Sequence, residues 1–181
     1  MKRGSDLTFY GKLIPMKSDF IDNDIMAHVL YALTYENRLV CKVCLETGLR
    51  IGDVLSFKTA DLAKKSFTIT EQKTKKKRVI RLRASLKKEL VRIAGQTYVF
   101  EGRNDPKKHR SRQAVYTDIK RACRAFRIKE NFTVHSLRKA YAVDLYKTSG
   151  SLENVKQALN HDNELTTLLY ALADELSKKK R

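Results

Sequence analysis

Residue types that mark disulfide frameworks, linkers and membrane segments are scarce in this chain. Its 181 residues include three cysteines, two prolines, seven glycines and no tryptophan. So few cysteines suit a reducing compartment, and so little proline and glycine leaves small room for linkers. No run of about 18 apolar residues occurs, so the sequence predicts no membrane span. The opening residues, MKRGSD, lead into no long apolar stretch and do not resemble a secretory signal.

Two of the cysteines, Cys41 and Cys44, form a CxxC pair, a spacing that also occurs in redox and metal sites. They lie inside the apolar helical run LVCKVCL at 39–45, with no second CxxC and no histidine at ligand spacing. The pattern favours buried thiols that act as small hydrophobic side chains, with redox or metal chemistry as the alternative. We therefore predict no metal site.

Acidic residues are too few to balance the basic ones. Lysine and arginine number 38 against 20 acids, a formal net charge of +18. Such an excess repels itself in the folded state, and a polyanionic partner relieves the repulsion. The basic clusters are spread along the chain, whereas a membrane anchor would concentrate them on one helix. The charge favours nucleic acid over a membrane surface. A solvated basic surface would explain any single cluster but not the whole excess.

The length allows one domain with its own core. Residues 1–17 look like an extended or flexible lead-in. Apolar spacing predicts a helix over about 18–36, with Ser18 and Asp19 as candidate caps, and a second over 37–46 stopped by Gly48. A short helix is expected over 50–55.

The chain then changes period. Alternation at 67–70 and the apolar residues of 79–82 predict a β-hairpin with a cationic turn at 73–77. A polar surface loop is expected at 101–110. Further helices are predicted over 84–94, 111–126, 135–148, 152–159 and 164–177. The fold class is therefore α+β: a mainly helical domain over 18–181 with one small antiparallel sheet.

Three segments carry candidate chemistry. Arg50 and Asp53, three apart on a helix, share a face, so the carboxylate can orient a guanidinium that matches two phosphate oxygens. His135 and Arg138 have the same spacing near a helix start, with Thr133 as a possible cap and Leu137 pointing to the core. Taken singly, both pairs are more often structural than catalytic.

The third segment contains His161 in the tripeptide LNH, followed nine residues later by Tyr170. Alone, Tyr170 would be a core aromatic of an apolar helix. The order and spacing of all these groups nevertheless resemble the tyrosine recombinases of the phage integrase family. The matching pieces, over about residues 18–177, are ETGLRIGDVL, ITEQKTKKKRVIRL, FTVHSLRKAYAVDLY, VKQALNH and Tyr170.

The resemblance implies a role for each group. Arg50 and Arg138 would bind the non-bridging oxygens of a scissile phosphate, His161 would hydrogen-bond one of them, and Asp53 would support Arg50. Tyr170 would attack phosphorus and leave a 3′-phosphotyrosine and a free 5′-hydroxyl. The general acid would be Lys73, favoured over the other turn lysines by its Lys-Thr context, and His135 would assist proton transfer. No cofactor is implied.

Departures from the family are mild. Gly52 and Asp53 replace a common Ser-Glu, Lys139 stands where many members have a histidine, and Asn160 replaces a frequent glycine. None removes a catalytic group. The remaining basic residues beside the site are expected to contact DNA: Lys75, Lys76, Lys77, Arg78 and Lys139.

The family further implies double-stranded DNA as substrate, a monomer when free, and four protomers acting through a Holliday junction. We expect a cytoplasmic, DNA-associated enzyme of a bacterium, phage or other mobile-element host. Only about 17 residues precede the catalytic fold, so the usual N-terminal core-binding domain is expected to be absent. An excised catalytic domain is favoured over a single-domain recombinase similar to the fimbrial invertases. A type IB topoisomerase and a non-catalytic DNA-binding protein are the alternatives.

Overall fold

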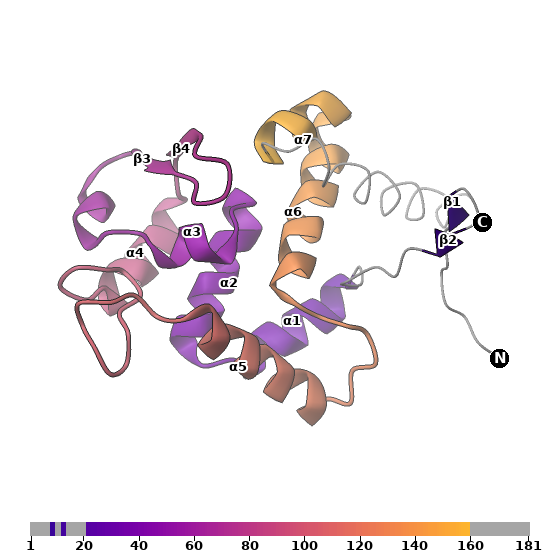
Figure 1. Ribbon diagram of the computed structural model, residues 1–181, viewed down its shortest axis with the longest axis horizontal. Coiled ribbons are helices and arrows are strands. Elements are labelled where there is room, and N and C mark those ends of the chain that lie inside the picture. Colours follow the sequence, from indigo (N-terminus) through magenta and orange to yellow (C-terminus); the bar gives the residue numbers. More distant parts are fainter. Residues whose placement is uncertain (1–7, 10–11, 14–20, 160–181) are drawn as a thin grey trace.

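Helices make up most of the computed structural model, which describes residues 8–9, 12–13 and 21–159 (Figure 1). The first helices are α1 (Asn23–Ala32), α2 (Tyr35–Thr47) and α3 (Ile51–Leu55). The later elements are the 3₁₀ helix η1 (Thr59–Ala63), the strands β3 (Phe67–Thr70) and β4 (Lys77–Ile80), and the helices α4 (Ala84–Ile93), α5 (Arg112–Ala125), α6 (Val134–Ser149) and α7 (Leu152–Leu159). The predicted helices at 84–94, 111–126, 135–148 and 152–159 are confirmed to within a residue or two. The predicted helix at 164–177 lies outside the described residues.

The corner between α1 and α2 differs from the prediction. The side chain of Asp22 caps α1 by accepting from the Asp24 backbone NH at 2.8 Å, whereas the predicted caps Ser18 and Asp19 lie outside the described residues. The chain turns at Leu33 and Thr34, so the predicted boundary between 36 and 37 is wrong. The position of the turn is set by a distant residue. Asp118 of α5 accepts hydrogen bonds from both the backbone NH and the hydroxyl of Thr34, at 2.9 and 3.1 Å.

The predicted hairpin is confirmed. Strands β3 and β4 pair antiparallel, with Phe67 opposite Ile80 and Thr70 opposite Lys77. The return strand begins at Lys77 rather than at 79, so Lys77, predicted to lie in the turn, belongs to the ladder. A second two-stranded ladder, which was not predicted, joins β1 (Thr8–Phe9) and β2 (Lys12–Leu13) in the lead-in.

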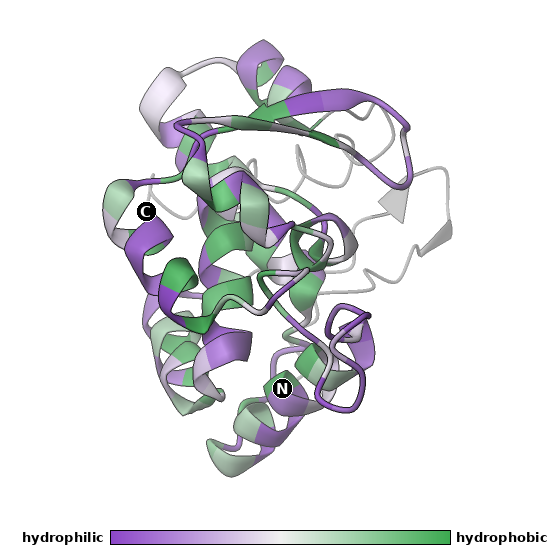
Figure 2. Ribbon diagram, turned by 90° about the vertical axis from the view of Figure 1, so that its left-hand side faces the viewer, coloured by the Kyte–Doolittle hydropathy of each residue, from purple (hydrophilic) through white to green (hydrophobic). Residues whose placement is uncertain are grey.

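The core forms around α2, against which α1, α3, α4 and α6 all pack (Figure 1). Hydrophobic and hydrophilic residues alternate along the surrounding helices (Figure 2). The core contains buried hydrophobic residues from these helices, including Val29, Leu90 and Leu137. Cys41 and Cys44 are buried in this core, as predicted, and burial raises the pKa of the Cys44 thiol to about 12. Both thiols are therefore protonated packing groups.

A smaller apolar cluster joins α6 to α7 and contains Ala142, Val143, Val155 and Leu159. It fixes the C-terminal end of α7 beside α6, at the point where the described chain approaches His161. Among the described helices, none has the length and apolar character needed to cross a membrane.

Candidate active site

The candidate site is built around the junction between α2 and α3. Gly48 ends α2 in the left-handed conformation (φ +65°), and a Cβ atom there would overlap the ring of Tyr141 on α6. Glycine is therefore required both by the backbone and by the close approach of α6. Arg50 is the N-cap residue of α3. Its backbone is extended, and its side chain is 14% exposed.

Arg50 pairs with a carboxylate that the sequence did not indicate. Its Nη1 lies 3.0 Å from Oε2 of Glu71, whose side chain is completely buried at the end of β3. The hydroxyl of Thr74 donates to the same oxygen at 3.1 Å. Arg78 places its Nη1 3.7 Å from Glu71 Oε1 and donates through Nη2 to the carbonyl of Thr47. The Glu71 carboxylate thus lies between the guanidiniums of Arg50 and Arg78, beside the end of α2.

Asp53 holds the hairpin against α3. Its carboxylate is buried and accepts from the backbone NH of Gln72 at 2.8 Å through Oδ1, while Oδ2 has no hydrogen-bond partner among the described residues. The Gln72 amide donates in turn to the carbonyl of Gly52 at 3.1 Å. These bonds position the turn in which Lys73 is exposed. The predicted role of Asp53 as a support of Arg50 stays a prediction.

Arg138 joins three helices through main-chain carbonyls. Although it is a charged residue, it is only 6% exposed. Its Nη1 donates to the carbonyl of Gly48, at the end of α2, and its Nη2 donates to that of Leu159 at 2.6 Å, at the end of α7. Helix C-termini carry partial negative charge, so both contacts stabilise the buried guanidinium.

The start of α6 forms as the sequence predicted. The Thr133 side chain accepts from the backbone NH of His135, and Ser136 completes a capping box by accepting from the backbone of Thr133. Leu137 is completely buried, whereas His135 is exposed at the first turn. The cap therefore sets the rotation that leaves His135 accessible and turns Arg138 inward.

The structure therefore brings four of the predicted groups to one region: Arg50 and Arg138 at the α2–α3 junction, Asp53 on α3, and the hairpin that carries Lys73. His161 and Tyr170 lie outside the described residues. The contact between Arg138 and Leu159, however, places the end of α7, two residues before His161, at the same junction.

The predicted DNA-contacting residues divide into two groups. Lys75, Lys76 and Lys77 are exposed around the hairpin turn, and Lys139 is half-buried on α6. Arg78 forms the second group: it lies in β4, and its guanidinium lies against Glu71 and Thr47. Its contact with DNA stays a prediction.

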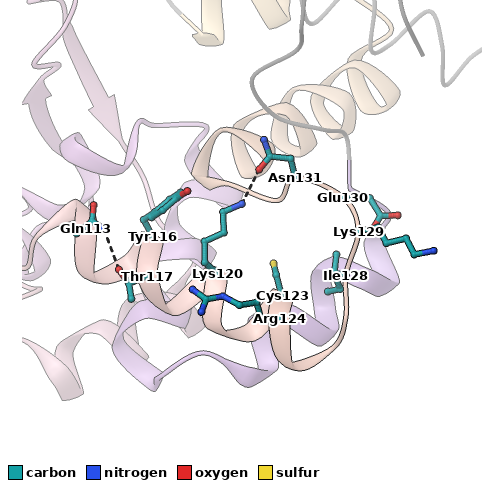
Figure 3. Close-up of a pocket in the computed structure, with 10 residues that line it drawn as sticks. All are labelled: Gln113, Tyr116, Thr117, Lys120, Cys123, Arg124, Ile128, Lys129, Glu130 and Asn131. Carbon is teal, nitrogen blue, oxygen red and sulfur yellow. Dashed lines mark hydrogen bonds between the residues drawn. The ribbon is translucent and has the colours of Figure 1, made fainter. Parts of the chain in front are cut away.

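A separate cavity of about 580 Å³ lies between α5 and residues 128–131 (Figure 3). Lys120 donates across it to Asn131 at 2.8 Å, and Arg124 and Lys129 give it a basic lining. Of the predicted catalytic residues that the structure describes, Arg50, Lys73, His135 and Arg138, none lines this cavity.

The fold is similar to that of solved site-specific recombinases. The structure is similar to that of the XerA recombinase, with a TM-score of 0.67, 18% identity, and coverage of 90% of this chain and 65% of that one. It is also similar to a lambda integrase (75–356) dimer bound to a COC′ core site, with a TM-score of 0.69, 22% identity, and coverage of 89% and 62%. At such identities the likeness shows the fold alone: that of a tyrosine recombinase catalytic domain.

Sequence comparison gives the family. Residues 21–176 match the model of the phage integrase family, and the chain belongs to that family. The chain is 30% identical over 133 residues to a XerD-like tyrosine recombinase of Streptococcus gordonii, covering 74% of this chain and 53% of that protein. To the probable integrase/recombinase YoeC of Bacillus subtilis it is 31% identical over 136 residues, covering 72% and 74%. The chain thus spans about half the length of the first of these relatives.

Proposed function

We propose that this chain cuts and rejoins double-stranded DNA at a specific site through a 3′-phosphotyrosine bond made by Tyr170. The observation that carries the proposal is the convergence of Arg50, Arg138 and the Lys73 hairpin on one helix junction. Two guanidiniums and a lysine supply the positive charge that a phosphoryl-transfer transition state needs.

In the proposed reaction, the Tyr170 oxygen bonds to phosphorus while the bond between phosphorus and the 5′-oxygen breaks. Arg50 and Arg138 stabilise the charge on the non-bridging oxygens, and His161 hydrogen-bonds one of them. Lys73 gives a proton to the departing 5′-oxygen, and His135 takes part in proton transfer at the tyrosine. Attack by a 5′-hydroxyl on the phosphotyrosine reverses these steps, so rejoining needs no ATP, metal or cofactor.

Integration or excision of a mobile element is the biological reaction that we propose. A related recombinase structure, lambda integrase, is a tetramer bound to a Holliday junction, and we propose the same assembly for this chain on DNA. The free chain would be a monomer. Its exposed turn lysines Lys75, Lys76 and Lys77, with Lys139, would contact the DNA backbone. The enzyme would act on DNA in the cytoplasm of a bacterium or of a phage or element host.

The test selects DNA sequences that become covalently attached to the protein. Nicked duplexes that carry a randomised central site are incubated with the protein, adducts that survive denaturant are isolated, and their DNA is sequenced. The wild-type chain and Tyr31→Phe, which removes the hydroxyl of an exposed tyrosine on α1, should both form adducts with one enriched sequence. Tyr170→Phe should form none.

The other outcomes are equally definite. An adduct that persists in Tyr170→Phe contradicts the assigned nucleophile. Binding without any adduct in the wild type indicates a non-catalytic DNA-binding protein, and relaxation of supercoiled DNA by dilute monomer indicates a topoisomerase-like enzyme.

A further inference from the structure

The buried Glu71 carboxylate has no role in the reaction described so far. It lies at the end of β3, two residues before Lys73, and its side chain is completely inaccessible to solvent. Burying an ionised carboxylate is costly unless charged or hydrogen-bonding groups compensate it. Here Arg50, Arg78 and Thr74 surround it, so its position is set by several independent contacts.

Glu71 fixes one end of the Arg50 guanidinium. The ion pair of 3.0 Å is formed by Nη1, and a guanidinium is a rigid planar fork. Holding one nitrogen therefore restricts the direction in which the other nitrogens of the same plane point. A lone charge on a mobile arginine would not have this directional constraint.

The other oxygen of Glu71 faces Arg78 in a longer ion pair of 3.7 Å. Arg78 connects the carboxylate to the carbonyl of Thr47 at the end of α2, and the backbone of Glu71 pairs with Lys75 and Lys76 across the turn. Its neighbour Gln72 is bound to Asp53 and Gly52 on α3. The carboxylate thus belongs to a rigid frame, which is what a group that orients another side chain requires.

We propose that Glu71 is a positioning residue for the reaction: its buried carboxylate sets the orientation in which Arg50 meets the scissile phosphate. This inference rests on the proposed function. A carboxylate that only stabilised the fold would leave the chemical step unchanged in a folded variant. A carboxylate that positions Arg50 would change the rate of strand cleavage without changing DNA affinity.

The first test measures single-turnover cleavage of the enriched nicked duplex. Glu71→Gln should slow adduct formation by up to about 100-fold, because small misplacements of an orienting group have effects of that size. Glu71→Asp, which restores the charge, should recover part of the rate. The control Glu89→Gln removes a carboxylate that is also paired with a cation, Lys42, but on α4, and should cleave at the wild-type rate.

Affinity is measured separately, with Tyr170→Phe added to each protein so that no cleavage occurs. Glu71→Gln should retain the affinity of its Tyr170→Phe parent. Equal cleavage by folded Glu71→Gln and wild type would overturn the inference. If Glu71→Gln does not fold, Thr74→Val replaces it, because this variant leaves the carboxylate in place and removes the hydroxyl that donates to its Oε2 and accepts from the backbone NH of Lys76 at 3.4 Å. It should show a smaller loss of rate, and an unchanged rate would overturn the inference.

Substrate analogues identify the group through which Glu71 acts. A 5′-bridging phosphorothiolate leaves as a thiolate, which needs no proton from Lys73 because thiols are far more acidic than alcohols. The Glu71→Gln defect should persist on this substrate. It should shrink on a methylphosphonate, which lacks one of the charged oxygens that arginine binds. Rescue by the phosphorothiolate would contradict the assignment to Arg50.

A second readout does not depend on activity. The NMR signal of the Arg50 guanidinium, assigned by its loss in Arg50→Lys, should be dispersed and in slow exchange in the free wild type and in Glu89→Gln. In Glu71→Gln it should move to the averaged position of mobile arginines. An unchanged Arg50 signal in Glu71→Gln would contradict the inference, whether or not the chain forms an adduct with DNA. Failure of the wild type to form an adduct would contradict only the proposed function.

Discussion

At the scale of single residues, the site depends on arginines whose partners are fixed. Arg138 bonds two main-chain carbonyls, and Arg78 bonds a third. A lysine could keep the charge at either position, but its single ammonium lacks the planar fork that reaches two acceptors in fixed directions.

The substitution Arg138→Lys is therefore expected to be harmful to the fold as well as to catalysis. It should leave a buried carbonyl without its donor and lower the free energy of unfolding by about 1–3 kcal/mol. Urea unfolding of the free protein measures this, with Arg124→Lys, an exposed arginine of α5, as the control that should match the wild type. Equal stability of Arg138→Lys and wild type would show that these two contacts contribute little.

The sequence predicted some residues of the site and missed others for identifiable reasons. Thr133 and Leu137 followed from capping and helical spacing, which are local properties. Glu71 did not, because one acidic residue at the start of a lysine-rich turn resembles a solvated position. Only the pairing register of the hairpin brings it against Arg50.

At the scale of elements, Asp118 shows how one side chain sets the arrangement of two helices, α5 and α2. It lies on α5 and accepts hydrogen bonds from Thr34 and Asn37, at the start of α2, and from Arg121. Burial alone would raise the pKa of this carboxyl, but the hydrogen bonds from Asn37, Thr34 and Arg121 outweigh burial and lower it.

Because the pKa of Asp118 is lower in the folded protein than in the unfolded chain, its contribution is present at neutral pH and is lost as pH falls through the folded pKa. Asp118→Asn should thus lower the free energy of unfolding by about 1.5–3 kcal/mol at pH 7, the usual range for hydrogen bonds to a charged group. The difference from wild type should become smaller at pH 3. Urea unfolding at both pH values checks this.

Asp144→Asn, at an exposed position of α6, is the control and should have no effect at pH 7. A stability difference for Asp118→Asn that is the same at both pH values would contradict an ionic origin.

The same corner explains why the element boundaries were only partly predictable. Apolar spacing continues through residues 29–36, so no local signal marks the break at Thr34. The hydrogen bonds to Asp118 span more than 80 positions, 84 for Thr34 and 81 for Asn37. Helices that begin and end with their own caps, such as α6 between Thr133 and Gly150, could be predicted closely.

At the scale of the whole molecule, the net charge of +18 should dominate DNA affinity. Each phosphate neutralised by a lysine releases counterions and adds about −0.9 to the slope of log affinity against log salt. The double variant Lys76→Gln/Lys77→Gln should therefore reduce the slope by about 2 if both lysines contact phosphates.

Fluorescence anisotropy with a labelled duplex at several salt concentrations gives the slope. Lys64→Gln, which removes a lysine paired with Asp61 on the 3₁₀ helix, is the control and should change the slope less. A wild-type slope in the double variant would remove these lysines from the DNA interface.

The bonds of Arg78 and Arg138 to main-chain carbonyls have a consequence for divergence. Every residue type has a carbonyl, so positions 47 and 159 can supply the acceptor without a particular side chain, whereas position 48 needs glycine for its left-handed backbone and the close approach of Tyr141. Substitutions around the site can then accumulate while its frame is kept. This tolerance agrees with the persistence of the fold between this chain and recombinases to which it is only 17–22% identical.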